Sequence, residues 1–320
     1  MNKILVTGGS GFIGSHFVRR MLNTRPDVEV VNVDALTYAG RKENLSDVEK
    51  NPRYHFVHGD ICDAKLVSDS MKECDAVIHF AAESHVDRAI IDASVFLRTN
   101  VLGTHALLEA ARQNDIKKFV CISTDEVYGH ILEGSFTEND VLNPRNPYAA
   151  SKAGAERLAY SYSQTYGMDV TITRSSNNFG PNQFPEKMLP LFVTNLIRGK
   201  KVPVYGDGMN VRDWLYVEDN CAAIDLVLQK GKAGEVYNIA GEHELPNMQM
   251  ITKILREMKK GDEMIQFVED RKGHDKRYSI DARKIKELGF APTLSFDQRL
   301  RETIEWYVGN AWWWTPLVKG

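Results

Sequence analysis

Residues 6–14 read Val6-Thr7-Gly8-Gly9-Ser10-Gly11-Phe12-Ile13-Gly14. The apolar run Lys3–Val6 before this stretch favours a β-strand, and the pattern over Ser15–Leu22 after it favours a helix. Glycines are needed in a strand–turn–helix unit where the backbone turns tightly and approaches a ligand closely. The stretch therefore predicts the first unit of an α/β fold.

Strand and helix patterns alternate through the first half of the chain. Further strands are predicted at Glu29–Val33, His55–His58, Ala76–Phe80, Lys118–Ile122 and Asp169–Thr173, and further helices at Thr99–Ala111 and Ser151–Tyr166. This alternation predicts a Rossmann-like, doubly wound parallel sheet, whose ligands bind beyond the carboxyl ends of the strands.

The glycines fit two forms of a dinucleotide-binding signature. Gly9, Gly11 and Gly14 fit G-x-G-x-x-G, while Gly8, Gly11 and Gly14 fit a more open G-x-x-G-x-x-G, and either form places a pyrophosphate on the helix N-terminus. Asp34 ends the second predicted strand, where a carboxylate holds ribose hydroxyls and repels the extra phosphate of NADP. We therefore predict NAD as the cofactor. Asp60 and Ile61, which follow the third strand, are expected near its adenine.

The alternation breaks after Gly180-Pro181, where several prolines follow. We predict that residues 1–180 form an NAD-binding domain, to which a helix at Val211–Leu228 and a strand at Gly234–Ala240 return. Residues 181–210 and 241–320 are expected to form a smaller, mixed α/β C-terminal lobe for the substrate. Aromatic residues 312–314 follow a helical pattern and are expected to be packing residues.

Acid–base groups gather around Ser123–Gly129 and Tyr148–Lys152. A free tyrosine titrates near 10, and a lysine one helical turn away favours its phenolate. Removal of a proton next to a carbonyl, with loss of a β-hydroxyl, needs one ionised and one protonated group. Asp125 and Glu126 can supply these only if the strand ends before them, because neighbouring residues on a strand point to opposite faces. The turn signal Tyr128-Gly129 favours such an end.

Together these motifs resemble the extended short-chain dehydrogenase/reductase family over nearly the whole chain. Sugar-nucleotide epimerases of that family usually carry small hydroxyl residues in place of Asp125-Glu126, and GDP-mannose dehydratases tend to have Thr-Ser-Glu. Thr124-Asp125-Glu126 is similar to the dTDP-glucose 4,6-dehydratases. Other similar stretches are Asp34–Gly40, Ala81–Arg88, Arg174–Pro181, Arg212–Asp219 and Asp270–Asp275.

The resemblance implies an NAD-dependent hydro-lyase that converts dTDP-glucose to dTDP-4-keto-6-deoxyglucose and water, in the biosynthesis of deoxysugar nucleotides such as that of rhamnose. Tyr148, supported by Lys152, would take the 4-hydroxyl proton, and Thr124 would hold the 4-oxygen. Glu126 would remove the C5 proton, and Asp125 would protonate the leaving C6 hydroxyl. A hydride would pass from C4 to NAD and return to C6.

The resemblance also implies two sets of binding residues. Besides Tyr148 and Lys152, the cofactor set is Gly8, Gly11, Phe12, Ile13, Gly14, Asp34, Ala35, Leu36, Thr37, Asp60, Ile61, Ala81, Ala82, Thr99 and Asn178. The substrate set is His85, Thr124, Asn177, Lys187, Met188, Pro203, Tyr205, Arg212, Asn247, Arg271, His274 and Tyr278. Arg212 is also favoured on physical grounds, because a guanidinium suits a diphosphate.

The composition of the chain argues against several classes of partner and location. At 320 residues the chain is long for one core, so two domains or a domain with a large lobe are expected. Its 43% of hydrophobic and 26% of charged residues are those of an ordinary globular protein. A net charge of −3 gives no case for nucleic acid. The four cysteines form no C-x-x-C pair, so we predict no metal and no disulfide framework, and a reducing cytoplasm. We expect no secretory signal and no membrane span.

Two alternatives stay open. The enzyme could act as a dehydratase or 4-epimerase on another nucleotide sugar, because few contacts in the second lobe set the identity of the base. A non-catalytic NAD-binding regulator is a third interpretation, against which the intact acid–base groups argue, since a sensor needs none. The resemblance further implies a homodimer, with Thr99–Ala111 and Ser151–Tyr166 as the candidate interface.

Overall fold

A parallel sheet of seven strands forms the larger part of the molecule. The structure is a computed structural model and describes residues 1–270 and 273–318. The strand order is β10-β6-β5-β4-β1-β2-β3. The strands are β1 (Lys3–Thr7), β2 (Glu29–Asp34), β3 (Tyr54–His58), β4 (Ala76–His79), β5 (Lys118–Thr124), β6 (Val170–Ser175) and β10 (Val236–Ile239). The six strands predicted in the first half are thereby confirmed. The order reverses between β1 and β4, and such a switch point is where ligands bind in open α/β sheets.

Helices cover both faces of this sheet because its strands are apolar on both sides. Ile4 and Val6 pack with residues of α1 (Phe12–Thr24) and α8 (Val217–Lys230). Leu5, which points the opposite way, packs in the cluster that holds residues of α5 (Thr104–Gln113) and α6 (Pro147–Tyr166). The other elements of this part are η1 (Lys42–Leu45), α2 (Ala64–Ser70), α3 (Val86–Ile91), α4 (Ser94–Phe96), the π-helical η2 (Leu97–Gly103), η3 (Asp125–Tyr128) and α10 (Arg283–Glu287).

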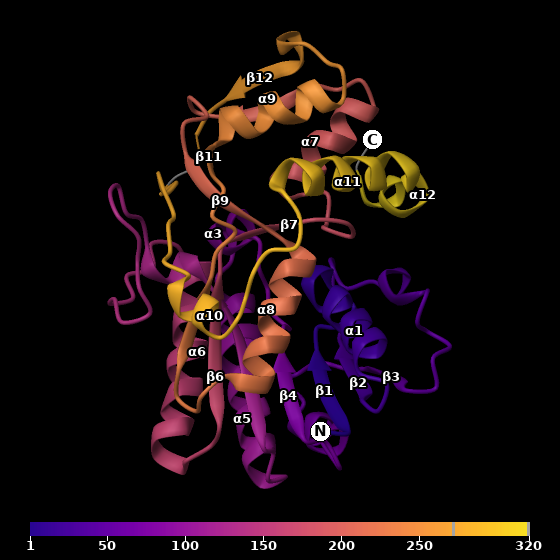
Figure 1. Cartoon of the computed structure of the whole chain (residues 1–320), viewed down its shortest axis with the longest axis vertical. Helices are drawn as coiled ribbons and strands as arrows, with labels where there is room; N and C mark the ends of the chain where they lie inside the picture. The colour runs from indigo at the N-terminus through magenta and orange to yellow at the C-terminus, as the bar shows by residue number, and fades with distance from the viewer. Residues whose placement is uncertain (271–272, 319–320) are drawn as a thin grey trace.

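A second lobe lies beyond the carboxyl ends of the large sheet (Figure 1). Its strands are β7 (Asn177–Phe179), β8 (Val202–Tyr205), β9 (Val211–Tyr216), β11 (Glu244–Pro246) and β12 (Ile265–Val268). Its helices are α7 (Met188–Ile197), α9 (Asn247–Glu257), η4 (Asp262–Met264), α11 (Phe296–Gly309), α12 (Ala311–Trp314) and η5 (Thr315–Leu317). One hydrophobic cluster joins these elements, and Trp214, Ile251, Leu300 and Trp313 belong to it.

The structure corrects two predicted helices. The helix predicted at Val211–Leu228 is wrong over its first six residues, which form β9 between β7 and β11. Residues 212–216 are all buried, including the charged Arg212 and Asp213, so the segment lacks the alternation of polar and apolar residues that indicates a half-buried strand. The helix predicted from Thr99 begins as the π-helical turn η2 and becomes α-helical only at Thr104.

The boundaries proposed for the two domains stay a prediction. Helix α10, from the stretch predicted to lie in the second lobe, packs its Ile285 side chain in the cluster that contains α1 and α8. No helix among the described residues combines the length and the apolar character needed to cross a membrane.

Candidate active site

The glycine-rich turn leaves space that any side chain would fill. Gly8 has a φ of +70°, and a Cβ there would lie 2.6 Å from the backbone nitrogen of Ala81. A Cβ on Gly14 would lie 2.2 Å from the carbonyl oxygen of Gly8. The turn therefore requires glycine at both positions, as close approach of β1 and α1 to a bound dinucleotide demands.

Helix α1 begins directly after this turn, and its N-terminus is open. Its N-cap is Gly11, no side chain caps it, and its first turn contains no acidic residue. Unpaired N–H groups and the positive end of the helix dipole favour an anion at such a terminus. Phe12 and Ile13 line a cavity there together with the glycines. These residues fit a pyrophosphate.

Asp34 lies at the end of β2 with both carboxylate oxygens engaged by backbone groups. Oδ2 accepts from the N–H of Ser10 at 2.9 Å, and Oδ1 accepts from the N–H of Leu36 at 2.8 Å. Burial raises the pKa of Asp34, and the two backbone hydrogen bonds oppose this increase. Each oxygen has a second lone pair, so the side chain can still accept ribose hydroxyls.

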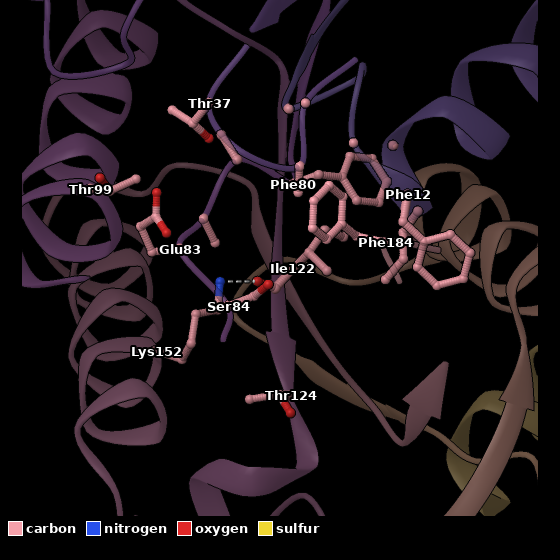
Figure 2. Close-up of a pocket in the computed structure, with 18 of the residues that line it drawn as sticks. Phe12, Thr37, Phe80, Glu83, Ser84, Thr99, Ile122, Thr124, Lys152 and Phe184 are labelled. Carbon is pink, nitrogen blue, oxygen red and sulfur yellow. Dashed lines mark hydrogen bonds between the residues drawn. The ribbon is translucent and has the colours of Figure 1, made fainter. Parts of the chain in front are cut away.

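A cavity of about 400 Å³ brings most of the predicted cofactor residues together. Every member of that set except Leu36 lines it. Leu36 instead holds Asp34 through its backbone. Figure 2 shows Phe12, Phe80 and Phe184 grouped on one side of the cavity, and Thr99 and Lys152 on the other.

Strand β5 ends at Thr124, and a 3-10 turn begins at Asp125. The expected strand end is therefore confirmed, and both carboxyl groups line the same cavity. The Thr124 hydroxyl donates to Oδ1 of Asp125 at 3.0 Å and accepts from the N–H of Glu126 at 3.3 Å. Thr124 thus fixes the position of both residues.

Asp125 is the more buried carboxyl of the pair, with 3% of its surface exposed. Burial, with the negative charge of Glu126 as the next cause, raises the pKa of Asp125 to about 8. Its Oδ2 accepts no hydrogen bond from the described residues, although it is buried. The raised pKa of Asp125 favours its protonated form at neutral pH, as the acid of an elimination requires.

Helix α6 carries both other acid–base groups. It begins at Pro147, and the side chain of the N-cap residue Asn146 accepts from the N–H of Ala149 at 2.8 Å. The amide of Asn146 also donates to Oε2 of Glu126 at 3.1 Å. Asn146 thus has two roles: it caps the helix that carries Tyr148, and it holds the carboxylate of Glu126.

Tyr148 and Lys152 both line the cavity, where Lys152 is buried and Tyr148 is half-buried. The Lys152 ammonium donates to the carbonyl of Ile122 at 2.6 Å, and burial lowers its pKa (Figure 2). Burial raises the pKa of Tyr148, and the charges of Glu126 and Asp125 raise it further, against a hydrogen bond with Thr124. Lys152 is not among the causes of this shift, so its support of a Tyr148 phenolate stays a prediction.

The predicted substrate residues divide into two groups. Thr124, Asn177 and Lys187 line the cavity, whereas the others do not: His85, Met188, Pro203, Tyr205, Arg212, Asn247, His274 and Tyr278. Arg271 lies outside the described residues. The roles of the second group stay predictions.

Arg212 and Tyr278 lie against each other in the second lobe. The guanidinium is 4.3 Å from the centre of the Tyr278 ring. It donates to the carbonyls of Val211 at 2.7 Å and of Asp275 at 2.9 Å. These contacts hold the guanidinium in one place, as recognition of a diphosphate requires.

Several residues of the cavity were missed by the sequence reasoning. Glu186 and Glu83 both line it, and a buried oxygen of Glu186 accepts no hydrogen bond from the described residues. Glu186 also pairs with Arg88 at 3.0 Å. No local pattern signals this pair, because the two residues are 98 positions apart. Asn146, which does not line the cavity but donates to Glu126, has a local signal, since Asn followed by Pro is typical of a helix start.

Known proteins resemble this chain along nearly its whole length. A family model described as GDP-mannose 4,6 dehydratase matches residues 5–303. The low-salt glycan biosynthesis protein Agl12 of Haloferax volcanii is 53% identical, over 96% of this chain and 99% of its own. A dTDP-glucose 4,6-dehydratase of an Actinoplanes species is 51% identical, over 98% of this chain and 100% of its own.

A solved structure agrees with these relatives. The crystal structure of DesIV, a dTDP-glucose 4,6-dehydratase of Streptomyces venezuelae with NAD bound, has a TM-score of 0.97 and 52% identity, and covers 99% of this chain and 100% of its own. The resemblance found in the sequence is confirmed: the chain belongs to the nucleotide-sugar dehydratase family described as GDP-mannose 4,6 dehydratase.

Proposed function

We propose that this protein is a dTDP-glucose 4,6-dehydratase that forms dTDP-4-keto-6-deoxyglucose and water. The observation that carries the proposal is the pair Asp125-Glu126, in which burial and the neighbouring charge raise the pKa of Asp125 to about 8. An alcohol dehydrogenase or an epimerase has no need of a protonated acid beside a carboxylate. A dehydratase needs both.

NAD fits the cavity through the residues already described. The Gly8–Gly14 turn and the N-terminus of α1 suit its pyrophosphate, Asp34 suits the adenosine ribose, and Lys152 would hold the nicotinamide ribose. When bound there, NAD supplies a hydride acceptor for C4 of the sugar and the hydride that C6 later receives. A carboxylate at Asp34 favours NAD over NADP.

The residues of the chain then move the protons. Tyr148 takes the proton of the 4-hydroxyl, while Thr124 holds the 4-oxygen. The resulting ketone acidifies C5, from which Glu126 removes a proton. Asp125 donates its proton to the C6 hydroxyl, which leaves as water. A proton finally returns to C5, so the sugar carries one solvent-derived hydrogen there.

Residues 125 and 126 also distinguish the proposed enzyme from two related classes of enzyme, the 4-epimerases and the GDP-mannose dehydratases. A 4-epimerase usually has small hydroxyl residues in place of the carboxyl pair, and a GDP-mannose dehydratase tends to have serine at the position of Asp125. The identity between this chain and curated dTDP-glucose 4,6-dehydratases, at 51% and 52% over at least 98% of the chain, supports thymine as the base. The product belongs to deoxysugar nucleotide synthesis.

We further propose a cytoplasmic homodimer. Leu102, at 61% exposure, and Tyr166, at 54%, are large apolar side chains on the two predicted interface segments. Burying them against a second copy would remove apolar surface from water. All four cysteines are free, which suits a reducing compartment.

The test is to incubate purified protein with dTDP-glucose and follow the ultraviolet absorbance that the 4-keto product develops in base. Product should form without net oxidation of the sugar and without added reductant. UDP-glucose and GDP-mannose serve as comparison substrates that test which nucleotide base the enzyme prefers. A product that is 4-epimerised and keeps its 6-hydroxyl, or faster turnover of GDP-mannose, would replace this proposal.

A further inference from the structure

The turn that begins the cofactor site is held from outside by a chain of polar contacts. The N–H of Gly9 donates to Oδ1 of Asn32 at 2.9 Å, and the N–H of Ser10 donates to Asp34. The carbonyl of Ser10 accepts from Nδ2 of Asn44 at 2.8 Å and from the N–H of Arg41 at 2.9 Å. The peptide that precedes Gly11 is thus fixed through its carbonyl by the segment around η1.

Asn44 is the link between this turn and the second lobe. It has no exposed surface, and its Oδ1 accepts from Nε1 of Trp313 at 2.8 Å. A longer contact of 3.4 Å, donated by Asn182, also reaches this oxygen. The indole N–H is only a donor and the Ser10 carbonyl is only an acceptor, so the two ends fix the orientation of the amide between them.

Trp313 is anchored in the hydrophobic core of the second lobe. It lies on α12, has 1% of its surface exposed and belongs to the hydrophobic cluster of the second lobe. Its ring centre is 5.2 Å from that of Trp306. The guanidinium of Arg41, whose backbone also donates to Ser10, is 5.6 Å from the Trp313 ring. Figure 1 shows α12 on the same side of the molecule as α1.

We propose that Trp313 is a positioning residue for the cofactor: through Asn44 it holds the Ser10 carbonyl, and with it the turn that receives the pyrophosphate. The C-terminal helix of the substrate lobe thereby contributes to the affinity for NAD without touching it. This inference rests on the proposed function only for the identity of the dinucleotide.

The chain offers a matched control on the same helix. Trp314 is equally buried, and its Nε1 donates to the carbonyl of Tyr307 at 2.7 Å, within the second lobe. Trp313→Phe and Trp314→Phe each remove one indole N–H and keep an aromatic ring. They differ in that only Trp313 is hydrogen-bonded to Asn44.

The experiment is calorimetric titration of NAD into the full-length wild type and the two variants after removal of bound nucleotide, with steady-state kinetics beside it. Trp313→Phe leaves Oδ1 of Asn44 with only the longer contact from Asn182, and this loss should weaken NAD binding by about tenfold. Turnover at saturating NAD and the Michaelis constant for dTDP-glucose should stay at wild-type values. Trp314→Phe should keep the wild-type dissociation constant, whatever its melting temperature.

Asn44→Ala breaks the same chain at its middle link and carries the test if Trp313→Phe does not fold. Combined with Trp313→Phe, its effect on NAD affinity should be less than additive. Wild-type affinity in either single variant, or equal losses in Trp313→Phe and Trp314→Phe, would overturn the inference and leave the proposed function standing. A wild type that binds no NAD would instead overturn the proposed function.

Discussion

Asp125 and Glu126 adjoin each other at the end of β5 but have different surroundings. Asp125 has an oxygen that accepts no hydrogen bond from the described residues, whereas Glu126 accepts from Asn146 at 3.1 Å. Burial and the charge of Glu126 raise the pKa of Asp125 to about 8. Environment, rather than residue type, thus separates the acid from the base.

The pH dependence of dehydration should follow from this pair. Asp125 donates a proton in its neutral form, so turnover should fall as the pH rises through about 8. Asp125→Asn should lower turnover by about 10²-fold or more and remove that falling limb. Initial rates of product formation between about pH 6 and 10 would measure it. If turnover of the variant still falls as the pH rises, a group other than Asp125 causes that fall.

The stability of the same variant should depend on pH with a defined sign. Because the folded-state pKa of Asp125 lies above the ordinary value of 3.8, its contribution to stability is fully present below 3.8 and is lost as the pH rises towards 8. An asparagine at position 125 does not titrate, so its contribution to stability does not change over this pH range. The melting temperature of Asp125→Asn relative to wild type should therefore rise between pH 5 and 8, whereas the exposed-site control Asp27→Asn should show no such trend.

Tyr148→Phe should lose the first oxidation, because no other residue of the motif takes the 4-hydroxyl proton. Turnover should fall by at least about 10²–10⁴-fold. Tyr160→Phe, further along α6, is the matched control and should stay near wild type. Near wild-type activity in Tyr148→Phe would remove the tyrosine from the mechanism.

Glu126 should govern exchange of the C5 hydrogen with solvent. In deuterium oxide the product should carry deuterium at C5, while the hydrogen from C4 appears at C6. Glu126→Gln keeps an oxygen that can accept from Asn146 but cannot take the C5 proton, so it should oxidise C4 and then stall with the cofactor reduced. Mass spectrometry and absorbance would show both effects. The control is Glu133→Gln on an exposed loop.

Asp34→Asn should weaken NAD binding and improve NADP relative to NAD, because the carboxylate no longer repels a 2′-phosphate. Asparagine keeps one oxygen for the backbone contacts with Ser10 and Leu36, so part of the turn is preserved. Titration with both cofactors measures the ratio. An unchanged preference would place the ribose elsewhere.

Arg212→Ala should raise the Michaelis constant for the nucleotide sugar and leave NAD affinity nearly unchanged, because a charge-assisted contact to the diphosphate is lost. The melting temperature should also fall, since Arg212 packs on Tyr278 and donates to two carbonyls. Arg283→Ala, on an exposed arginine, controls for loss of charge. Equal losses for substrate and NAD would make Arg212 a structural residue.

The sequence alone determined the parts of this protein that depend on local geometry. Gly8 and Gly14 have no room for a side chain, and Asp34 ends a strand, so a short stretch of chain specifies the turn and the strand end at which a pyrophosphate and a ribose are predicted to bind. The end of β5 before Asp125 was likewise predicted, because residues on a strand alternate between faces. The spacing of Tyr148 and Lys152 is one helical turn wherever the helix lies.

Only the tertiary structure decided the features that depend on burial and on distant partners. The pKa of Asp125 follows from its burial, which no neighbouring residue in the chain encodes. The strand β9 was missed because all of residues 212–216 are buried, two of them charged, so no alternation of polar and apolar residues signals a strand. The contact between Asn44 and Trp313 joins residues 269 positions apart, and the energy of such a contact is set by the folded core around it.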